Sequence, residues 1–408
     1  MTQALHDVNV LDVNLFDPAV LDDPYPTLDR LRRDAPVYRL PGTNFFVVSR
    51  WDLVAEGLTR TSDFSSNLTA VLIHDPVTGI GAFDMDRDRE ALHVLATADD
   101  PLHREHRKLV LPALVAKRIQ ALEPVVVECV RALWTERRSA ESIEWIDAMA
   151  SRLPLAVVAR LIGLPDADVP RLVRWAYAST ELVSGVVTTR LLPATLTAVV
   201  ELAGYLNSAF SAALKHPGDD LLGDLARAHR ADEVSAEAAV LILVQLVGAG
   251  GESTAGLMGN AASVIACDQA LQARVRADRD LLGPVLEEVM RLESPFRGHL
   301  RHVVADTTLG GVPLPAGGHV VLLWGAANRD PAVFAEPAEF RLGRTNIRSH
   351  LGFGKGIHFC VGASLARLEA RIALDVLLSE TTRVDLTDAV WVPSLFVRRH
   401  SCLTLALT

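Results

Sequence analysis

The sequence predicts a mainly α-helical protein with small β-sheets at its periphery. Six segments carry apolar residues at the i, i+3 and i+4 spacing of a helix with one buried face. Strand-like stretches are short, and they fall into one group near the N-terminus and another after residue 300. The expected helices cover residues 119–138, 145–162, 195–214, 235–267, 280–292 and 362–378.

The first group of strand-like residues predicts a hairpin. Residues 36–40 and 44–49 are rich in apolar side chains, and Pro41, Gly42 and Thr43 between them favour a turn. The second group supplies three further short strands. They are expected at residues 302–304, 320–323 and 402–407.

Composition and charge exclude several classes of protein. The chain has 408 residues, of which 50% are hydrophobic, and no Gly/Ser/Pro-rich linker divides it, so we expect a single domain over residues 1–408. The formal net charge of −10 argues against a nucleic-acid partner, which requires a basic face. The N-terminus lacks a signal-peptide pattern, and the longest apolar stretch, residues 240–249, is too short to span a bilayer. A cytoplasmic protein without a membrane partner is expected.

The longest expected helix, residues 235–267, contains Gly248, Gly250, Gly251 and Gly256. Each interior glycine costs a helix about 0.5–1 kcal/mol relative to alanine. Four of them indicate either that a bulky group passes close to the backbone or that the helix is deformed. The alternative is tight packing against other helices.

One cysteine has a context that points to chemistry. The four cysteines are widely spaced without a Cys-x-x-Cys pair, and only Cys360 lies in a glycine-rich loop that runs into a helical segment. The N–H groups and the positive dipole end of that helix would stabilise a thiolate. A thiolate held in this way is a strong ligand for iron.

Residues 353–362 resemble the haem-binding signature of cytochromes P450, Phe-x-x-Gly-x-x-x-Cys-x-Gly, and Leu-Ala-Arg follows at residues 365–367. The resemblance implies the cytochrome P450 fold and a haem b cofactor (iron protoporphyrin IX). It assigns Cys360 as the metal ligand, and it places Phe353 and Gly362 in the cofactor site. With the motifs below, the resemblance spans almost the whole chain.

A Glu-x-x-Arg motif, Glu288 and Arg291, precedes the cysteine by some 70 residues, as in this family. At the i, i+3 spacing the two side chains share a helix face and can form an ion pair. The resemblance implies that this structural pair is buried. Glu339 replaces the arginine that many members carry before Phe340, so the third partner of the pair is either Arg341 or Arg344.

Four basic residues match positions that bind the haem propionates in the family. His103 and Arg107 fit its His-x-x-x-Arg motif, one helical turn apart, while Arg301 and His358 align with two further propionate contacts. Pairs of this kind are strong because charge assists the hydrogen bond. The alternative for His103, Arg107 and Arg301 is an ordinary solvated basic turn.

The segment from Ala249 to Thr254 resembles the family's Ala-Gly-x-[Asp/Glu]-Thr motif, which delivers protons to dioxygen beside the haem. Carried over to this chain, the motif makes Glu252 the acid and Ser253 the alcohol, and it places Ala249 against the haem. Serine in place of threonine keeps the hydroxyl but loses the methyl group that fixes its rotamer. Two alternatives stay open: Thr254 supplies the hydroxyl, or Ser253 only bonds back to the helix.

The resemblance also implies a substrate pocket with mostly apolar walls. Such a pocket suits a medium-sized, natural-product-like small molecule of secondary metabolism that carries a few polar groups. Arg297 is placed either in this pocket, on a propionate or on a surface carboxylate. The pocket residues are Asn67, Phe83, Val244, Gly248, Phe296, Arg297, His299 and Phe396.

The implied function is that of a haem-thiolate monooxygenase. The alternatives are a P450-type oxidase that couples radicals without oxygen insertion, and a haem-binding protein without turnover. The sequence carries no dinucleotide fingerprint, so electrons are expected from a ferredoxin and an NAD(P)H-dependent ferredoxin reductase. Lys108, Lys355 and Arg367 offer a cationic patch for an acidic carrier, unless they are ordinary solvated side chains.

Overall fold

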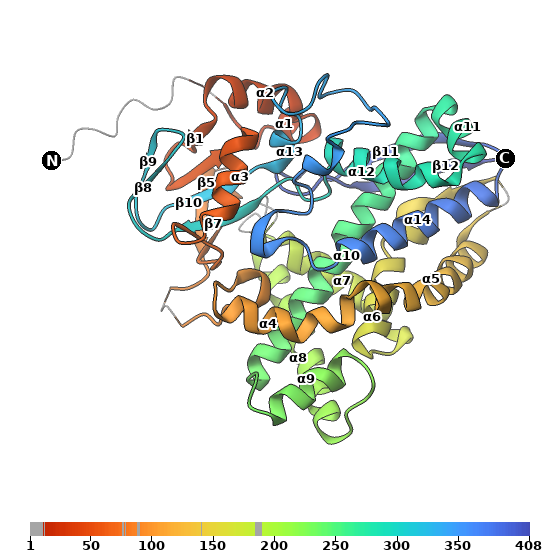
Figure 1. Ribbon diagram of the computed structural model, residues 1–408, viewed down its shortest axis with the longest axis horizontal. Helices are drawn as coiled ribbons and strands as arrows, with labels where there is room; N and C mark the ends of the chain where they lie inside the picture. The colour runs from red at the N-terminus through yellow and green to blue at the C-terminus, as the bar shows by residue number, and fades with distance from the viewer. Residues whose placement is uncertain are drawn as a thin grey trace.

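The computed structural model describes residues 11, 13–75, 77, 79–87, 90–139, 141–183 and 190–408. Helices form most of the body, and small sheets lie mainly toward the N-terminal side (Figure 1). The described α-helices are α1 (Pro18–Asp22), α2 (Tyr25–Asp34), α3 (Trp51–Thr59), α4 (Leu102–Val110), α5 (Ala116–Arg137), α6 (Leu153–Ile162), α7 (Val169–Glu181), α8 (Leu192–Lys215), α9 (Leu221–Arg230), α10 (Ala236–Cys267), α11 (Gln269–Ala277), α12 (Leu282–Leu292), α13 (Trp324–Ala327) and α14 (Ala363–Ser379).

The described strands form one larger sheet and three smaller ones. The five-stranded sheet has the order β1-β2-β10-β7-β3, and the others are β11-β12-β6, β4-β5 and β8-β9. The strands are β1 (Val37–Arg39), β2 (Phe45–Val48), β3 (Phe64–Ser65), β4 (Ala70–Asp75), β5 (Gly79–Asp84), β6 (Ser142–Glu144), β7 (His299–Val303), β8 (Thr307–Leu309), β9 (Val312–Leu314), β10 (His319–Leu322), β11 (Val384–Trp391) and β12 (His400–Leu407).

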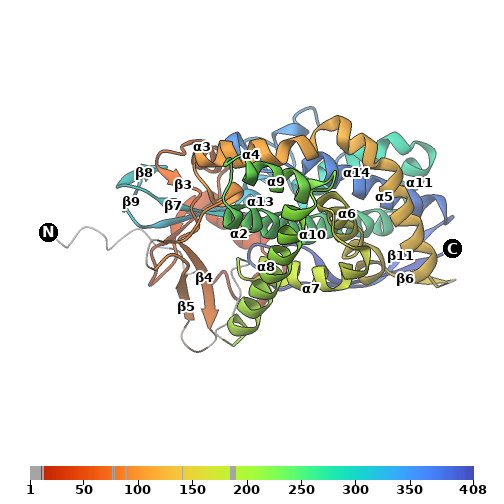
Figure 2. The same cartoon turned by 90° about the horizontal axis from the view of Figure 1, so that it is seen from below.

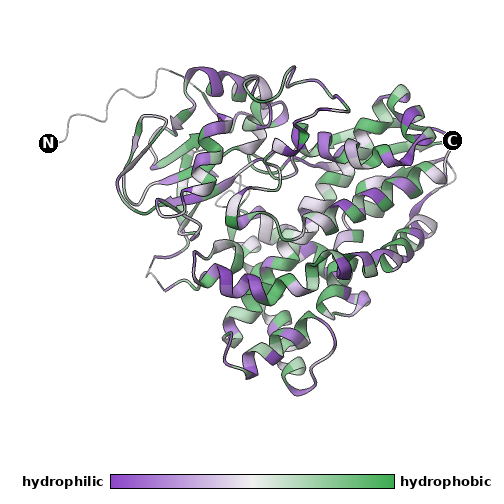
Figure 3. Ribbon diagram, viewed as in Figure 1, coloured by the Kyte–Doolittle hydropathy of each residue, from purple (hydrophilic) through white to green (hydrophobic). Residues whose placement is uncertain are grey.

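Helix α10 forms the centre of the helical body, where it packs against α6, α7, α8, α12 and α14. The side chain of Ser235 caps its start by accepting a 3.0 Å hydrogen bond from the N–H of Ala238. Hydrophobic residues occupy most of its length (Figure 3). Among the described helices, α10 alone is long and apolar enough to cross a membrane, but 61% of its apolar window is buried within the protein. That degree of burial is typical of a core helix.

The glycines of α10 lie where neighbouring segments closely approach the helix. A Cβ atom at Gly248 would lie 2.6 Å from the hydroxyl of Ser179, and one at Gly256 would lie 2.8 Å from the Cβ of Pro295. Gly250 and Gly251 face side chains of α6 in the same way. These distances are too short for a real Cβ, so the glycines permit close packing of neighbouring segments. This observation supports the alternative of tight packing against other segments.

All five predicted strand segments form strands, and the hairpin pairs Val37 with Val48. Strand β10 lies parallel to β2 and antiparallel to β7. Four of the predicted helices match α5, α8, α10 and α14 closely, and the segment at 280–292 divides into a 3₁₀ turn and α12.

The predicted helix at residues 145–162 is interrupted. A π-helical turn at Ile146–Ala150 precedes α6, and Pro154 lies in the first turn of that helix. Proline has no N–H to continue the hydrogen-bond ladder, so the second helix has to start afresh. The sequence also did not predict the β4–β5 hairpin, which extends from the body on the same side as α8 in Figure 2.

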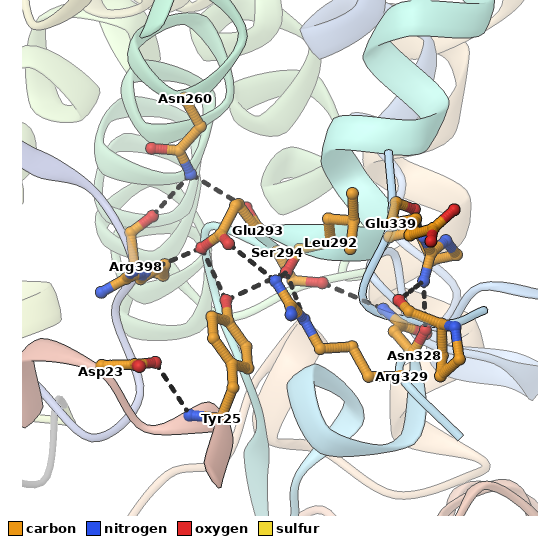
Figure 4. A network of polar contacts seen from close by, with 12 residues as sticks. Asp23, Tyr25, Asn260, Leu292, Glu293, Ser294, Asn328, Arg329, Glu339 and Arg398 are labelled. Carbon is orange, nitrogen blue, oxygen red and sulfur yellow. Dashed lines mark hydrogen bonds and ion pairs between the residues drawn. The ribbon is translucent and has the colours of Figure 1, made fainter. Parts of the chain in front are cut away.

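A polar network around Glu293 joins the N-terminal helices, the central helix and the C-terminal segment (Figure 4). The Glu293 carboxylate accepts hydrogen bonds from Tyr25 at 2.6 Å, Arg398 at 2.8 Å and Arg329 at 2.9 Å. The amide of Asn260 on α10 donates to the backbone carbonyls of Glu293 and Arg398, both at 2.9 Å. The network therefore fixes the backbone at Arg398, just before β12.

Candidate functional site

The loop before α14 presents Cys360 in a compact turn. Gly354 and Gly356 adopt φ angles of +72° and +73°, which side chains rarely tolerate. The N–H of Cys360 donates to the carbonyl of Phe353 at 2.9 Å, which closes the loop. Gly362 then caps α14, so the sulfur stands at the helix N-terminus, as the sequence predicted.

Two effects oppose each other at the Cys360 thiol. The side chain has an accessible face but is surrounded by protein on its other sides, and this burial raises its pKa. The N–H groups of Gly362 and Ala363, together with the cations of Arg107 and Arg367, act in the opposite direction. Burial outweighs them, so the pKa of the Cys360 thiol lies above its ordinary value. A bound cation, such as iron, would favour the deprotonated form.

Basic side chains from three separate elements gather beside this loop. His103 of α4 and His358 of the loop have ring centroids 4.0 Å apart, and both rings are at least partly buried. Arg107 donates to the carbonyl of Phe359 at 2.7 Å, and Arg301 of β7 is 5% exposed. Helix α4, strand β7 and the loop thus bring together all four predicted propionate ligands.

These groups depress one another's affinity for protons. Burial, followed by the charges of His103, Arg301, His299 and Arg107, lowers the pKa of His358 to about 3. Burial lowers the pKa of Arg301 to about 10. The Nδ1 atom of His103 has no hydrogen-bond partner, although Asp100 lies 3.4 Å away.

A buried cluster of this kind is stabilised by an anionic ligand. The residues present therefore fit a haem, with its two carboxylates at the basic cluster and its iron at Cys360. Phe353 is buried and packs against Phe359, at a ring-centroid distance of 6.3 Å. Ala249 is exposed although α10 is mostly buried, which leaves its surface available to a flat ligand.

Glu252 and Ser253 are neighbours on α10 but have different surroundings. The hydroxyl of Ser253 donates to the carbonyl of Ala249 at 2.7 Å, so it bonds back to the helix as one alternative held. Glu252 is 4% exposed and accepts hydrogen bonds from Arg399 and Thr180. Neither partner was recognised from the sequence. Thr180 and Arg399 lie 72 and 147 positions from Glu252 along the chain, and no local motif relates residues so far apart.

The Glu-x-x-Arg pair is buried as predicted. Arg291 donates two hydrogen bonds to Glu288, at 2.7 and 2.9 Å, and the two side chains are 0% and 1% exposed. Of the two alternatives for the third partner, Arg344 supplies its guanidinium at 2.8 Å, whereas Arg341 contributes only its backbone N–H. Burial would raise the pKa of Glu288, but these hydrogen bonds lower it overall.

The residues predicted for the substrate pocket differ in their placement. Phe396 is buried in the N-terminal core cluster, where Phe83 of β5 packs against it. Val244 of α10 packs against the main core. Asn67, Phe296 and His299 are half-buried, and burial lowers the pKa of His299 to about 4.

Two of the predicted pocket residues contact other segments of the protein. Gly248 faces Ser179 of α7, so it serves helix packing. Arg297 is 2% exposed and donates to the backbone carbonyls of Ser394 and Val397. Its Nη2 group therefore holds the C-terminal segment in place, and the burial of the side chain excludes a surface carboxylate, while the Nε and Nη1 atoms are buried without a hydrogen-bond partner among the described residues.

Comparison with known proteins agrees with this geometry. The family model of cytochrome P450 matches residues 254–383. Cytochrome P450 144 of Mycobacterium tuberculosis is 48% identical over 398 residues, covering 97% of this chain and 92% of that protein. Cytochrome P450 monooxygenase PikC of Streptomyces venezuelae is 30% identical over 412 residues, covering 97% of this chain and 94% of that protein.

Solved structures show the same relationship. The crystal structure of ligand-free CYP164A2 from Mycobacterium smegmatis superposes with a TM-score of 0.85 at 31% identity, covering 96% of this chain and 98% of that one. The likeness therefore extends over almost the whole of both chains. The chain therefore belongs to the cytochrome P450 family of haem-iron monooxygenases.

Proposed function

We propose that this P450 binds haem b through Cys360 and oxygenates a medium-sized, mostly apolar, natural-product-like molecule in the cytoplasm. The observation that carries the proposal is the cysteine at the start of α14 beside four basic side chains from three elements. A porphyrin with two carboxylates and a central iron satisfies both features at once. When bound, the haem supplies the activation of dioxygen, while the protein supplies orientation and protons.

Each group in the site has a defined task under this proposal. Cys360 donates its sulfur to the iron, and His103, Arg107, Arg301 and His358 hold the carboxylates by charge-assisted hydrogen bonds. Ala249, Phe353 and Gly362 shape the surface on which the flat group lies. Glu252 and Ser253 supply protons to the oxygen side of the site.

The proposed substrate class rests on the half-buried side chains that the family resemblance assigns to the pocket. Phe83, Val244 and Phe296 offer apolar surface, whereas Asn67 and His299 offer a few polar groups. Such a mixture favours ligands that are largely apolar with isolated amide or hydroxyl groups. A binding screen in which fatty acids or terpenes alone shift the Soret band would contradict the natural-product assignment.

A second candidate function is oxidative coupling without oxygen insertion. It is favoured by one observation, the 2.7 Å hydrogen bond that engages the Ser253 hydroxyl with the helix carbonyl of Ala249. A hydroxyl engaged in this way is a weaker proton donor to the site. Mass spectrometry of product formed under labelled dioxygen separates the two functions, because the label enters the product only in oxygenation.

We also propose that electrons arrive from a ferredoxin, reduced by its NAD(P)H-dependent reductase. A groove of ≈ 1300 Å³ next to the thiolate loop includes Phe359, Arg348 and Arg367 among its lining residues. Arg367 is paired with Glu287 at 2.5 Å, while Arg348 and Lys108 are exposed. An acidic carrier complements these cations. Arg348→Glu should therefore slow electron transfer at low salt, and Arg33→Glu, in an exposed pair, should not.

The thiolate bond itself is tested by the spectrum of the reduced protein under carbon monoxide. The parent protein should absorb at the position of a thiolate-ligated haem, and Cys360→Ser should lose that band. Purified protein that stays colourless after haem supplementation contradicts the proposal. So does a Cys360→Ser variant with an unchanged spectrum.

A further inference from the structure

A small cavity lies beside Arg297, between the N-terminal helices and the segment before β12. Its volume is ≈ 10 Å³, which is about the space that one water-sized ligand needs. Apolar side chains from α1, α2, the end of β10 and the C-terminal segment form its wall, including Leu21, Leu28, Leu323 and Leu395. Among the described residues that line this cavity, Arg297 is the only polar one. The cavity therefore presents one cation in apolar surroundings.

The protein satisfies only part of the Arg297 guanidinium. Its Nη2 atom donates to the carbonyl of Ser394 and, at 3.4 Å, to that of Val397. Its Nε and Nη1 atoms are buried and have no hydrogen-bond partner within the part of the chain that the structure describes. A buried donor without a partner is costly, and a buried charge without a counterion costs more. The two remaining N–H groups therefore favour an acceptor in the cavity.

The charges around Arg297 do not balance its cation. Glu293 is the carboxylate that acts on it, but Glu293 already accepts hydrogen bonds from Arg329 and Arg398 (Figure 4). The cation of Arg398 is buried as well and repels that of Arg297, while Asp23, which also acts on Arg398, is exposed. Burial, the largest effect, lowers the pKa of Arg297 to about 10, so the side chain is still protonated at neutral pH. The region therefore needs a further negative charge.

The chemistry of the lining distinguishes an anion from a water molecule. A water molecule would accept hydrogen bonds from Nε and Nη1 of Arg297, but its own hydrogens would meet apolar side chains. A halide ion accepts hydrogen bonds and donates none, and its charge strengthens each bond to the guanidinium. Chloride is similar in size to water, whereas a carboxylate, phosphate or sulfate is too large for this volume. The lining therefore favours a halide.

We propose that this cavity is a buried halide site, in which one chloride ion accepts hydrogen bonds from Nε and Nη1 of Arg297. The backbone N–H of Arg297 donates to the carbonyl of Phe396 at 2.6 Å, so the ion joins α1 and α2 to the segment that carries Phe396. The described lining residues include none of those proposed to hold the haem. The inference therefore does not depend on the proposed function.

Bromide identifies the site directly, because it replaces chloride and scatters X-rays anomalously. Crystals of the haem-loaded protein soaked in sodium bromide should show an anomalous peak within hydrogen-bond distance of Nε and Nη1 of Arg297. Crystals of Arg297→Met should lack that peak, because the donors have been removed. A cavity that holds water-like density without an anomalous signal overturns the inference.

In solution the ion should stabilise the fold, because it binds the folded chain alone. Gluconate is too large for the cavity and serves as the reference anion at constant ionic strength. Its replacement by about 0.1 M chloride should raise the midpoint of thermal unfolding of the haem-loaded parent by about 1–3 °C. Arg297→Met should lose this chloride dependence. Arg33→Met is the matched control, because its pair with Asp34 is exposed, and it should respond to chloride as the parent does.

A second variant tests the site without removing the guanidinium. Val20→Ile adds a methyl group to the cavity wall and leaves the hydrogen bonds of Arg297 in place, so it decides the question if Arg297→Met does not fold. It should bind no bromide and show no chloride dependence. A chloride dependence equal to that of the parent, in either variant, overturns the inference. So does a bromide peak without a chloride-dependent midpoint, since binding would then occur at crystal concentration only.

Discussion

The guanidinium of Arg344 lies 2.8 Å from the carboxylate of Glu288, although the two residues are 56 positions apart. Together with Arg291 they form a buried cluster in which two cations share one carboxylate. The remaining donors of Arg291 reach the carbonyls of Asn328 at 3.0 Å and Pro337 at 2.7 Å. The cluster therefore ties α12 to the chain that leads to the thiolate loop.

Removal of one partner of this cluster should be strongly destabilising. Arg291→Met leaves the Glu288 carboxylate buried with fewer partners, at an expected loss of about 3–5 kcal/mol in the free energy of unfolding. Arg33→Met serves as the matched control, because its pair with Asp34 is exposed and should contribute about 0–1 kcal/mol. Denaturant unfolding of both variants measures the difference. Equal losses would contradict the assignment of a structural role.

Two helical glycines, one in α10 and one in α8, have different surroundings, which predict opposite effects on stability when each is replaced by alanine. Gly256→Ala places a Cβ against the rigid ring of Pro295 at 2.8 Å, so we expect a loss of about 1–3 kcal/mol. Gly204 in α8 has open space around it, and Gly204→Ala should gain about 0.5–1 kcal/mol from improved helix propensity. Thermal unfolding of the two variants checks the signs. A stable Gly256→Ala protein would mean that this contact relaxes freely.

The stability of the fold should decrease in acid, partly through His400. This side chain is 1% exposed and packs against Trp391 with the ring centroids 3.7 Å apart, and burial lowers its pKa to about 4. In the unfolded chain, His400 binds a proton below about pH 6.5, whereas in the folded chain it binds one only below about pH 4. The free energy of unfolding therefore decreases as the pH falls from about 6.5 to about 4.

The variant His400→Gln isolates this contribution. The decrease in stability between pH 7 and pH 4.5 should be about 2 kcal/mol smaller than in the parent protein. The control is His216→Gln, which replaces an exposed histidine. Denaturant unfolding at the two pH values gives the comparison. An unchanged slope in His400→Gln would show that His400 takes up its proton without unfolding.

The basic cluster predicts how firmly the haem is retained. Arg301→Gln removes a buried cation from the proposed carboxylate site, at a cost of about 1.5–3 kcal/mol in haem affinity. Transfer of haem to apomyoglobin should therefore accelerate relative to the parent. Arg50→Gln, which disrupts an exposed pair with Asp52, provides the control. If both variants release haem at the parent rate, Arg301 does not hold the cofactor.

The sequence alone determined the class of fold and the centre of the site. Apolar spacing located α5, α8, α10 and α14, because each buries a long stripe that a local pattern reveals. The thiolate loop could also be predicted from the sequence, since its glycines and Cys360 lie within one short segment and their geometry is local. The pairing of Glu288 with Arg291 was readable for the same reason, because both residues lie on one helical turn.

Only the tertiary structure decided which distant side chains complete these groups. It selected Arg344 over Arg341 for Glu288, brought Arg399 and Thr180 to Glu252, and buried Arg297 against the C-terminal segment. It also showed that the glycines of α10 face neighbouring side chains. Such contacts depend on how separate segments pack in three dimensions, and neither periodicity nor spacing along one chain records that packing.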